Sequence, residues 1–169
     1  MRSISPKLVV VFGLPGTGKT TFARALSREL GWMHLNTDVI RAELGKKQQY
    51  DERAKAFIYQ KMQSLTAKEL ESEKGVVLDG TFYKETLRDS FRKLSSRYGI
   101  PLKWIEVCAD EGIIRKRVAQ ERPYSEADFQ VYKKIQKAFE PLHEPCLKVF
   151  SGREELSEMI QKSIAFIDL

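Results

Sequence analysis

The chain has 169 residues, with 29 Lys and Arg against 23 Asp and Glu, which gives a formal net charge of +6. This length fits one domain, the composition is that of an ordinary globular protein, and no apolar segment reaches the roughly 18 residues of a membrane span. The two cysteines, Cys108 and Cys146, are too few for a disulfide framework, so we expect a cytoplasmic protein without a membrane segment.

Strands and helices are predicted to alternate along the chain. The apolar, β-branched run 7–12 is typical of a buried parallel strand, and helical spacing follows over 19–30. Further strands are expected at 32–36, 76–78, 101–108 and 147–150. Further helices are expected at 39–44, 51–74, 84–98, 109–120, 126–140 and 154–167. Thr37 or Asp38 is expected to cap the helix 39–44, and His34 is expected to be a packing residue of the second strand.

The segment between the first strand and the first helix reads Gly13-Leu-Pro-Gly16-Thr-Gly18-Lys19-Thr20. Glycines in this spacing let main-chain N–H groups approach phosphate oxygens, and the helix directs its positive N-terminus at the same anion. Lys19 is expected to contact the β- and γ-phosphates, and Thr20 to ligate magnesium. The motif therefore predicts a P-loop that binds ATP with Mg²⁺. The expected nucleotide-binding residues are Gly13, Leu14, Pro15, Gly16, Thr17, Gly18, Lys19, Thr20 and Thr21.

A P-loop inside alternating strands and helices predicts an α/β fold. We expect a three-layer P-loop NTPase fold with a roughly five-stranded parallel sheet and a helical lid. Residues 1–169 are expected to form a single domain, with a helical acceptor-side insertion at about 45–74 and the lid at about 110–140.

Two aspartates follow predicted strands, where ligands of open parallel sheets collect. Asp38 is a candidate to orient the nucleophile, and Arg41, one helical turn later, can face the same cleft. The alternative for Asp38 is a helix cap, and the spacing does not separate the two. Asp79 is a candidate magnesium ligand through water, or else a turn residue before Gly80. No acidic residue follows Asp79, which favours transfer to a hydroxyl over ATP hydrolysis.

Basic residues gather in the helix after the fourth strand. Arg117 and Arg122 are assigned to a lid that supplies charge to the transition state and excludes water. Arg115 and Lys116 are expected to be solvated or to face the substrate. The candidate catalytic residues are thus Lys19, Asp38, Arg117 and Arg122.

Acceptor specificity is expected to reside in the segment 45–74. Tyr50, Phe57 and Tyr59 could stack on a base, but helical spacing favours a core position for Phe57. The net positive charge favours anionic partners such as a nucleotide, a phosphorylated metabolite or RNA. Aromatic and basic residues do not alternate strongly enough to indicate nucleic-acid binding.

Together these segments resemble the small P-loop kinase group, which includes the kinase domain of phage polynucleotide kinase, zeta toxins, gluconate kinase and chloramphenicol phosphotransferase. The resemblance covers about residues 7 to 150 and rests on the P-loop, Asn36-Thr-Asp38-Val-Ile-Arg41, Val76-Val-Leu-Asp79 and the arginine-rich helix. It implies that Asp38 acts as the base toward the acceptor hydroxyl and that Arg41 helps to hold the acceptor. Two features differ from the polynucleotide kinase: Gly80 separates Asp79 from Thr81, and Arg117 and Arg122 are one residue further apart.

The sequence therefore predicts an ATP-dependent kinase that transfers the γ-phosphate to a hydroxyl of a small molecule or a nucleic-acid end. A polynucleotide 5′-hydroxyl kinase specifically, or a non-catalytic ATP-binding regulatory module, are the alternatives. ATP is the expected donor because the guanine-specific Asn-Lys-x-Asp motif is absent from the sequence.

Overall fold

The strands of this chain form one parallel sheet. In the computed structural model, residues 4–46, 49–121 and 126–169 are described. The strands are β1 (Leu8–Phe12), β2 (Met33–Asn36), β3 (Val76–Asp79), β4 (Leu102–Cys108) and β5 (Cys146–Phe150). Their order is β2-β3-β1-β4-β5, and every pairing is parallel. The central strand β1 is buried along its whole length, which explains its uninterrupted apolar sequence.

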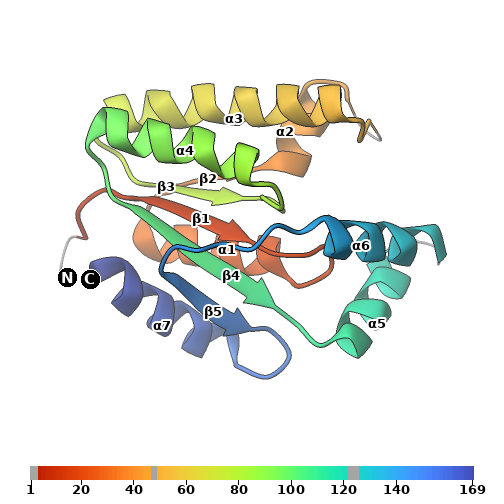
Figure 1. The fold of residues 1–169 in the computed structure, drawn as a ribbon. Coiled ribbons are helices and arrows are strands. Elements are labelled where there is room, and N and C mark those ends of the chain that lie inside the picture. The colour runs from red at the N-terminus through yellow and green to blue at the C-terminus, as the bar shows by residue number, and fades with distance from the viewer. Residues whose placement is uncertain (1–3, 47–48, 122–125) are drawn as a thin grey trace.

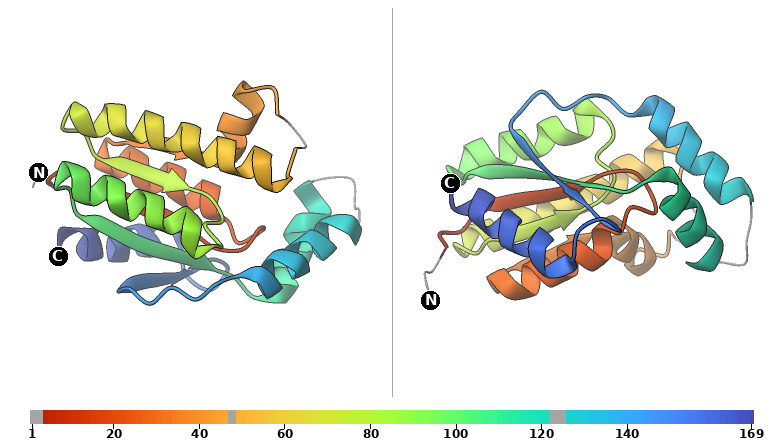
Figure 2. Two further views of the ribbon diagram at one scale, coloured as in Figure 1. Left: turned by 45° about the horizontal axis from the view of Figure 1, so that its top comes forward. Right: turned by 90° about the horizontal axis from the view of Figure 1, so that it is seen from below.

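Helices cover both faces of the sheet and complete three layers (Figure 1). One face carries α1 (Lys19–Leu30) and α7 (Leu156–Asp168), and the other carries α3 (Glu52–Glu71) and α4 (Glu85–Tyr98). The short α2 (Thr37–Glu43) follows β2, while α5 (Glu111–Glu121) and α6 (Glu126–Ala138) lie beyond the ends of β1 and β4, as Figure 2 shows. Within the described ranges, none of the helices combines the length and apolar character that a bilayer crossing requires.

The alternation of side chains along β1 divides the core in two. Leu8, Val10 and Phe12 pack with residues of α3 and α4, whereas Val9 and Val11 pack with residues of α1 and α7. All five are at most 1% exposed. Because each fully buried aliphatic or aromatic side chain contributes about 1.5–3 kcal/mol, this strand is a major source of stability. It also fixes the P-loop, which begins at the next residue.

The face of α3 that packs against the core differs from the one predicted from the sequence. Phe57 is 46% exposed and Tyr59 only 5%, so the expected core position of Phe57 is wrong. Residues two apart differ by about 200° around a helix axis, so only one of the two can face the sheet. The Tyr59 ring packs edge-on against Phe82, with centroids 5.0 Å apart, and its hydroxyl accepts a hydrogen bond from the Phe82 N–H at 3.1 Å.

Candidate active site

The loop between β1 and α1 has a conformation that favours glycine at three positions, Gly13, Gly16 and Gly18. Gly13 has φ +145°, and a Cβ there would lie 2.5 Å from the carbonyl oxygen of Val107 on β4. Gly18 has φ +91° and directly precedes the first residue of α1. A side chain would strain the backbone at both positions. Because the loop leads directly into the N-terminus of α1, its main-chain N–H groups and the helix dipole favour a bound anion.

Lys19 starts α1 and turns its side chain back over this loop. Its Nζ donates a hydrogen bond to the carbonyl of Leu14 at 2.9 Å, and the Thr17 hydroxyl donates to the same oxygen at 2.9 Å. Burial lowers the pKa of Lys19 below 10.5, whereas the carboxylates of Asp79 and Asp38 act in the opposite direction. The fold thus brings Lys19 within electrostatic range of both aspartates, which the chain separates widely.

A hydrogen-bond network joins Thr20 to Asp79 through Asn36. The strand register sets Asn36 of β2 beside Asp79 at the end of β3. The Asn36 amide nitrogen donates to Asp79 Oδ2 at 2.6 Å and to the Thr20 hydroxyl at 3.2 Å. His34 Nε2 lies 3.1 Å from the same Asp79 oxygen, so His34 contacts the site, contrary to the expectation that it only packs. The two predicted metal ligands, Thr20 and Asp79, are therefore neighbours in space.

The second carboxylate oxygen of Asp79 fits a role toward magnesium. The residue is 1% exposed, and Oδ1 is buried without a hydrogen-bond partner. An unpaired buried acceptor is costly, so a water molecule held by a cation would stabilise it. Across the described part of the chain, no three His, Cys, Asp or Glu side chains form a set that could hold a metal ion unaided. This arrangement fits Mg²⁺, which keeps waters and binds phosphate oxygens beside one or two protein ligands.

Asp38 is not the cap of α2. The side-chain oxygen of Asn36 accepts from the N–H groups of Asp38 at 2.8 Å and Val39 at 3.0 Å, so Asn36 is the N-cap. The expected cap at Thr37 or Asp38 is therefore wrong. The Asp38 side chain is instead 75% exposed, and one carboxylate oxygen accepts a 2.6 Å hydrogen bond from Arg41. This frees the other carboxylate oxygen for a ligand.

Arg41 holds Asp38 from a buried position. Its side chain is 8% exposed, its guanidinium lies 4.6 Å from the ring centre of Tyr50, and its Nε has no hydrogen-bond partner. The Tyr50 ring is half exposed. The ion pair between Asp38 and Arg41 shows that the two side chains lie on the same side of α2, while their shared role toward a ligand stays a prediction.

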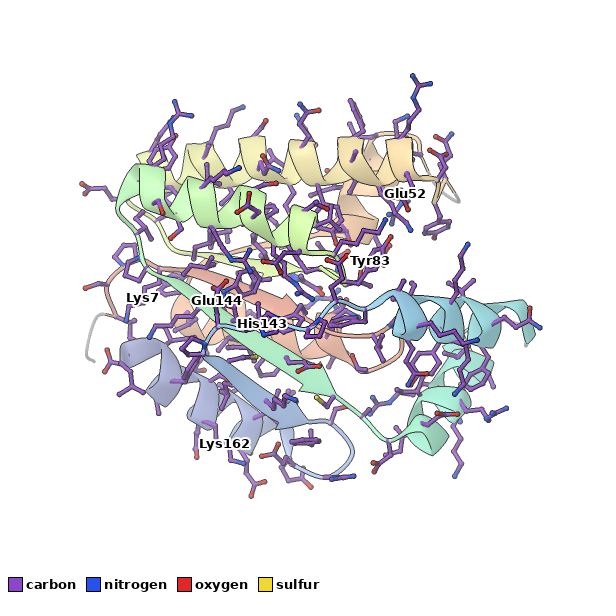
Figure 3. The ribbon with its side chains drawn as sticks, viewed as in Figure 1. Lys7, Glu52, Tyr83, His143, Glu144 and Lys162 are labelled. Atoms are coloured by element: carbon purple, nitrogen blue, oxygen red, sulfur yellow. The ribbon has the colours of Figure 1, made fainter. Side chains whose placement is uncertain are left out.

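The start of α3 is bound to the loop that follows Asp79. Figure 3 shows Glu52 of α3 and Tyr83 of that loop at the same end of α3 and α4. The Tyr83 hydroxyl lies 3.4 Å from Glu52 Oε1 and accepts a 2.9 Å hydrogen bond from Lys55, while Lys84 donates to Glu52 at 3.1 Å. The helix that carries the expected acceptor segment is thus fixed to the loop after β3.

The helix α5 packs directly on the P-loop. Ile114 and Val118 lie 3.1 and 3.2 Å from the position that a Cβ on Gly16 would take, and Leu14 packs against the cluster of Ile114, Phe129 and Tyr132. Gly16 has φ +79°, so its backbone conformation and the close approach of α5 both disfavour a side chain there.

The Arg117 side chain contacts the carbonyl side of the P-loop. Its Nη1 donates to the Ser151 hydroxyl at 2.8 Å and lies 3.4 Å from the Gly16 carbonyl oxygen. Arg115 lies with its guanidinium 3.9 Å from the ring centre of Phe129, and Lys116 is exposed. Arg122 falls outside the described residues.

Sequence reasoning missed His34, Asn36 and Ser151 as residues of this site. Asn36 is a polar residue at the buried end of a strand, which is a signal that could have been read from the sequence. Ser151 carries no such signal, because its contact with the P-loop spans 134 positions of the chain.

A family model described as an AAA domain matches residues 8–142. The chain belongs to this AAA-domain family. Among curated proteins, none matches it in sequence. The match spans the P-loop, both aspartates and the whole predicted lid, and it ends before β5.

Solved structures share the fold of this AAA-domain chain at low sequence identity. The APS kinase CysC of Mycobacterium tuberculosis, in complex with AMPPNP and APS, is 16% identical, with a TM-score of 0.75 over 98% of this chain and 99% of its own. A gluconokinase of Sinorhizobium meliloti 1021 is 15% identical, with a TM-score of 0.75 over 98% and 93%. Kti12 of Chaetomium thermophilum, in complex with ADP-AlF3, is 18% identical, with a TM-score of 0.71 over 95% and 98%. The resemblance to the small P-loop kinase group and the predicted P-loop NTPase fold are thereby confirmed.

Proposed function

We propose that this chain is an ATP-dependent kinase that transfers the γ-phosphate to a hydroxyl of a small molecule or of a nucleic-acid end. The observation that carries the proposal is the exposed Asp38 carboxylate. Asn36 caps α2 in its place, so the carboxylate is not used as a cap, and Arg41 holds it just after β2. The kinases among the structures of the same fold support it.

The donor half of the proposed reaction consists of the P-loop and the Thr20–Asn36–Asp79 network. The N–H groups of residues 13–21 and the Lys19 ammonium would bind the phosphates. Thr20 would ligate Mg²⁺ directly and Asp79 would do so through water. The cation, when bound, neutralises charge on the β- and γ-phosphates. Phosphoryl transfer depends mainly on such positioning and charge neutralisation, which these residues can provide.

The acceptor half consists of Asp38 and Arg41. The acceptor hydroxyl would donate its hydrogen bond to the free oxygen of Asp38 and pass its proton there as the new O–P bond forms. The bond from the γ-phosphorus to the bridging oxygen breaks, and ADP leaves. Arg41 would fix the carboxylate and contact the acceptor. In the proposed lid, at about 110–140, Arg122 would add positive charge near the phosphates, and Arg117 would hold the P-loop from its carbonyl side.

The test is Asp38→Asn, with Glu43→Gln on the same helix as the matched control. A screen with labelled ATP, a metabolite panel and a 5′-hydroxyl oligonucleotide identifies the acceptor, and calorimetry with Mg-AMPPNP measures donor binding. Because Asn cannot take the proton, we expect transfer to fall by at least about 10²-fold with donor affinity nearly unchanged. Glu43→Gln should retain activity.

The outcomes separate the alternatives. Label on the oligonucleotide alone would identify a polynucleotide 5′-hydroxyl kinase. Tight AMPPNP binding without phosphorylation of any acceptor would favour a non-catalytic regulatory module. Normal transfer by Asp38→Asn would remove Asp38 from the mechanism.

A further inference from the structure

The loop after β5 lies against the carbonyl side of the P-loop. The Ser151 hydroxyl donates a 2.5 Å hydrogen bond to the Thr17 carbonyl and accepts the 2.8 Å bond from Arg117. The Ser151 N–H donates to the Cys108 carbonyl at 2.9 Å, which holds the residue at the end of the sheet. Gly152 packs so closely on Ile113 of α5 that a Cβ would lie 2.5 Å from its Cδ1. Ser151 therefore connects β5, α5 and the P-loop.

The geometry of the peptide unit links the carbonyl groups that Ser151 and Arg117 contact to the N–H groups on the opposite side of the P-loop. A trans peptide is planar, and its C=O and N–H point opposite ways. The Thr17 carbonyl shares its peptide with the Gly18 N–H, and the Gly16 carbonyl shares its peptide with the Thr17 N–H. Groups that fix the two carbonyls on one side therefore fix the direction of two N–H groups on the other side. Hydrogen bonds to the carbonyls also polarise the peptides and make those N–H groups stronger donors.

We infer that Ser151 and Arg117 are positioning residues that aim the N–H groups of Thr17 and Gly18 at the phosphates of the nucleotide. This inference rests on the proposed function only in that the P-loop binds a nucleotide. Thr17 is 2% exposed, so loss of the Ser151 hydroxyl leaves its carbonyl buried without that partner. The same pair couples the position of α5 to phosphate binding.

The experiment compares Ser151→Ala with Ser151→Thr, which keeps the hydroxyl, and with Ser157→Ala, a matched control at an exposed position of α7. Dissociation constants for Mg-AMPPNP and for Mg-tripolyphosphate are measured by competition. Loss of one buried hydrogen bond predicts about tenfold weaker binding of both ligands by Ser151→Ala. Ser151→Thr should restore most of the affinity. The amide proton resonance of Gly18 should move in Ser151→Ala and return in Ser151→Thr.

A double-mutant cycle with Arg117→Ala tests whether the two residues act together. Since Arg117 donates to the Ser151 hydroxyl and the two residues hold adjacent peptides of the loop, the losses of affinity should be less than additive. Three results would overturn the inference. They are an unchanged affinity of Ser151→Ala for both ligands, a loss of affinity for AMPPNP but not for tripolyphosphate, and fully additive losses in the double mutant. If no acceptor is found, the proposed kinase activity loses support, but the binding measurements still test the role of Ser151 and Arg117. Absence of AMPPNP binding by the unaltered chain would overturn both.

Discussion

The lowered pKa of Lys19 makes nucleotide affinity sensitive to alkaline pH. Burial lowers the pKa below 10.5 in the free chain, so the ammonium group loses its proton at a lower pH than an exposed lysine does. A bound polyphosphate favours the charged form and raises the pKa again. Affinity for Mg-AMPPNP should therefore fall, with proton uptake on binding, as pH rises through the lowered pKa toward 10.5.

The measurement is a pH series of calorimetric titrations in buffers of different ionisation enthalpy. Lys19→Met serves as the comparison, because it cannot be charged. It should bind about 10- to 100-fold more weakly near neutral pH and lack the alkaline decline. The same alkaline decline in Lys19→Met would assign the titration to another group.

Single residues of the site differed in how far they could be predicted. Lys19 and Thr20 could be placed because the P-loop motif is local. The contact between Asn36 and Asp79 could not, since it joins residues 43 positions apart and depends on β2 lying next to β3. The spacing of Asp38 left a cap and a free carboxylate equally open, and the Asn36 hydrogen bonds separate these two. The roles assigned to Asp38, Arg117 and Arg122 remain predictions.

At the scale of elements, one side chain serves two purposes at the junction of β2 and α2. Asn36 accepts the first N–H groups of α2 with its oxygen and donates to Asp79 and Thr20 with its nitrogen. Asn36→Ala should lower the free energy of unfolding by about 1–2 kcal/mol, because the helix loses its cap and Asp79 a donor.

Asn36→Ser is the matched variant, since Ser also caps helices but its hydroxyl does not extend to Asp79. In denaturant unfolding, Asn36→Ser should lower the free energy of unfolding less than Asn36→Ala does. Both variants should weaken Mg-AMPPNP binding. Equal loss of stability in the two variants would mean that the cap contributes nothing.

The helix α3 shows where periodicity is ambiguous. Phe57 and Tyr59 are both large and apolar enough to face the sheet, and the 20 residues of α3 offer several apolar stripes. Tyr59 is buried because its hydroxyl has a partner in the Phe82 N–H. That partner comes from the loop after β3, so helical spacing alone could not identify it.

At the scale of the whole molecule, a fully buried arginine joins the segment after α6 to the loop after β3. Arg88 of α4 donates to the carbonyls of Phe82 at 2.7 Å, Glu140 at 2.6 Å and Pro141 at 3.1 Å. Its guanidinium lies 5.3 Å from the ring centre of Phe139. The segment after α6 is thereby fixed to the loop that follows Asp79.

Arg88→Met should lower the free energy of unfolding by about 3 kcal/mol, because these carbonyls lose charged donors in a buried position. Arg97→Met, at an exposed position of the same helix, should change it by less than about 0.5 kcal/mol. Guanidinium unfolding curves measure both. A loss below about 1 kcal/mol for Arg88→Met would indicate that water replaces the guanidinium.

The number of strands and their parallel direction could be predicted because alternating apolar runs and helices leave few arrangements. The order β2-β3-β1-β4-β5 could not be read from those runs, since strand pairing joins segments far apart in the chain. The contact of α5 with Gly16 also depends on tertiary packing, although the glycine itself was evident.

The central place of β1 has a consequence for biosynthesis. Both strands that flank it are made later, β3 from Val76 and β4 from Leu102. Pairing strands so distant in the chain requires loop closure before any contact is gained, which slows folding. The apolar run of β1 thus leaves the ribosome without its partners and with open edges that other chains can join. Until β4 has emerged, one edge of β1 has no partner strand and can pair with another chain.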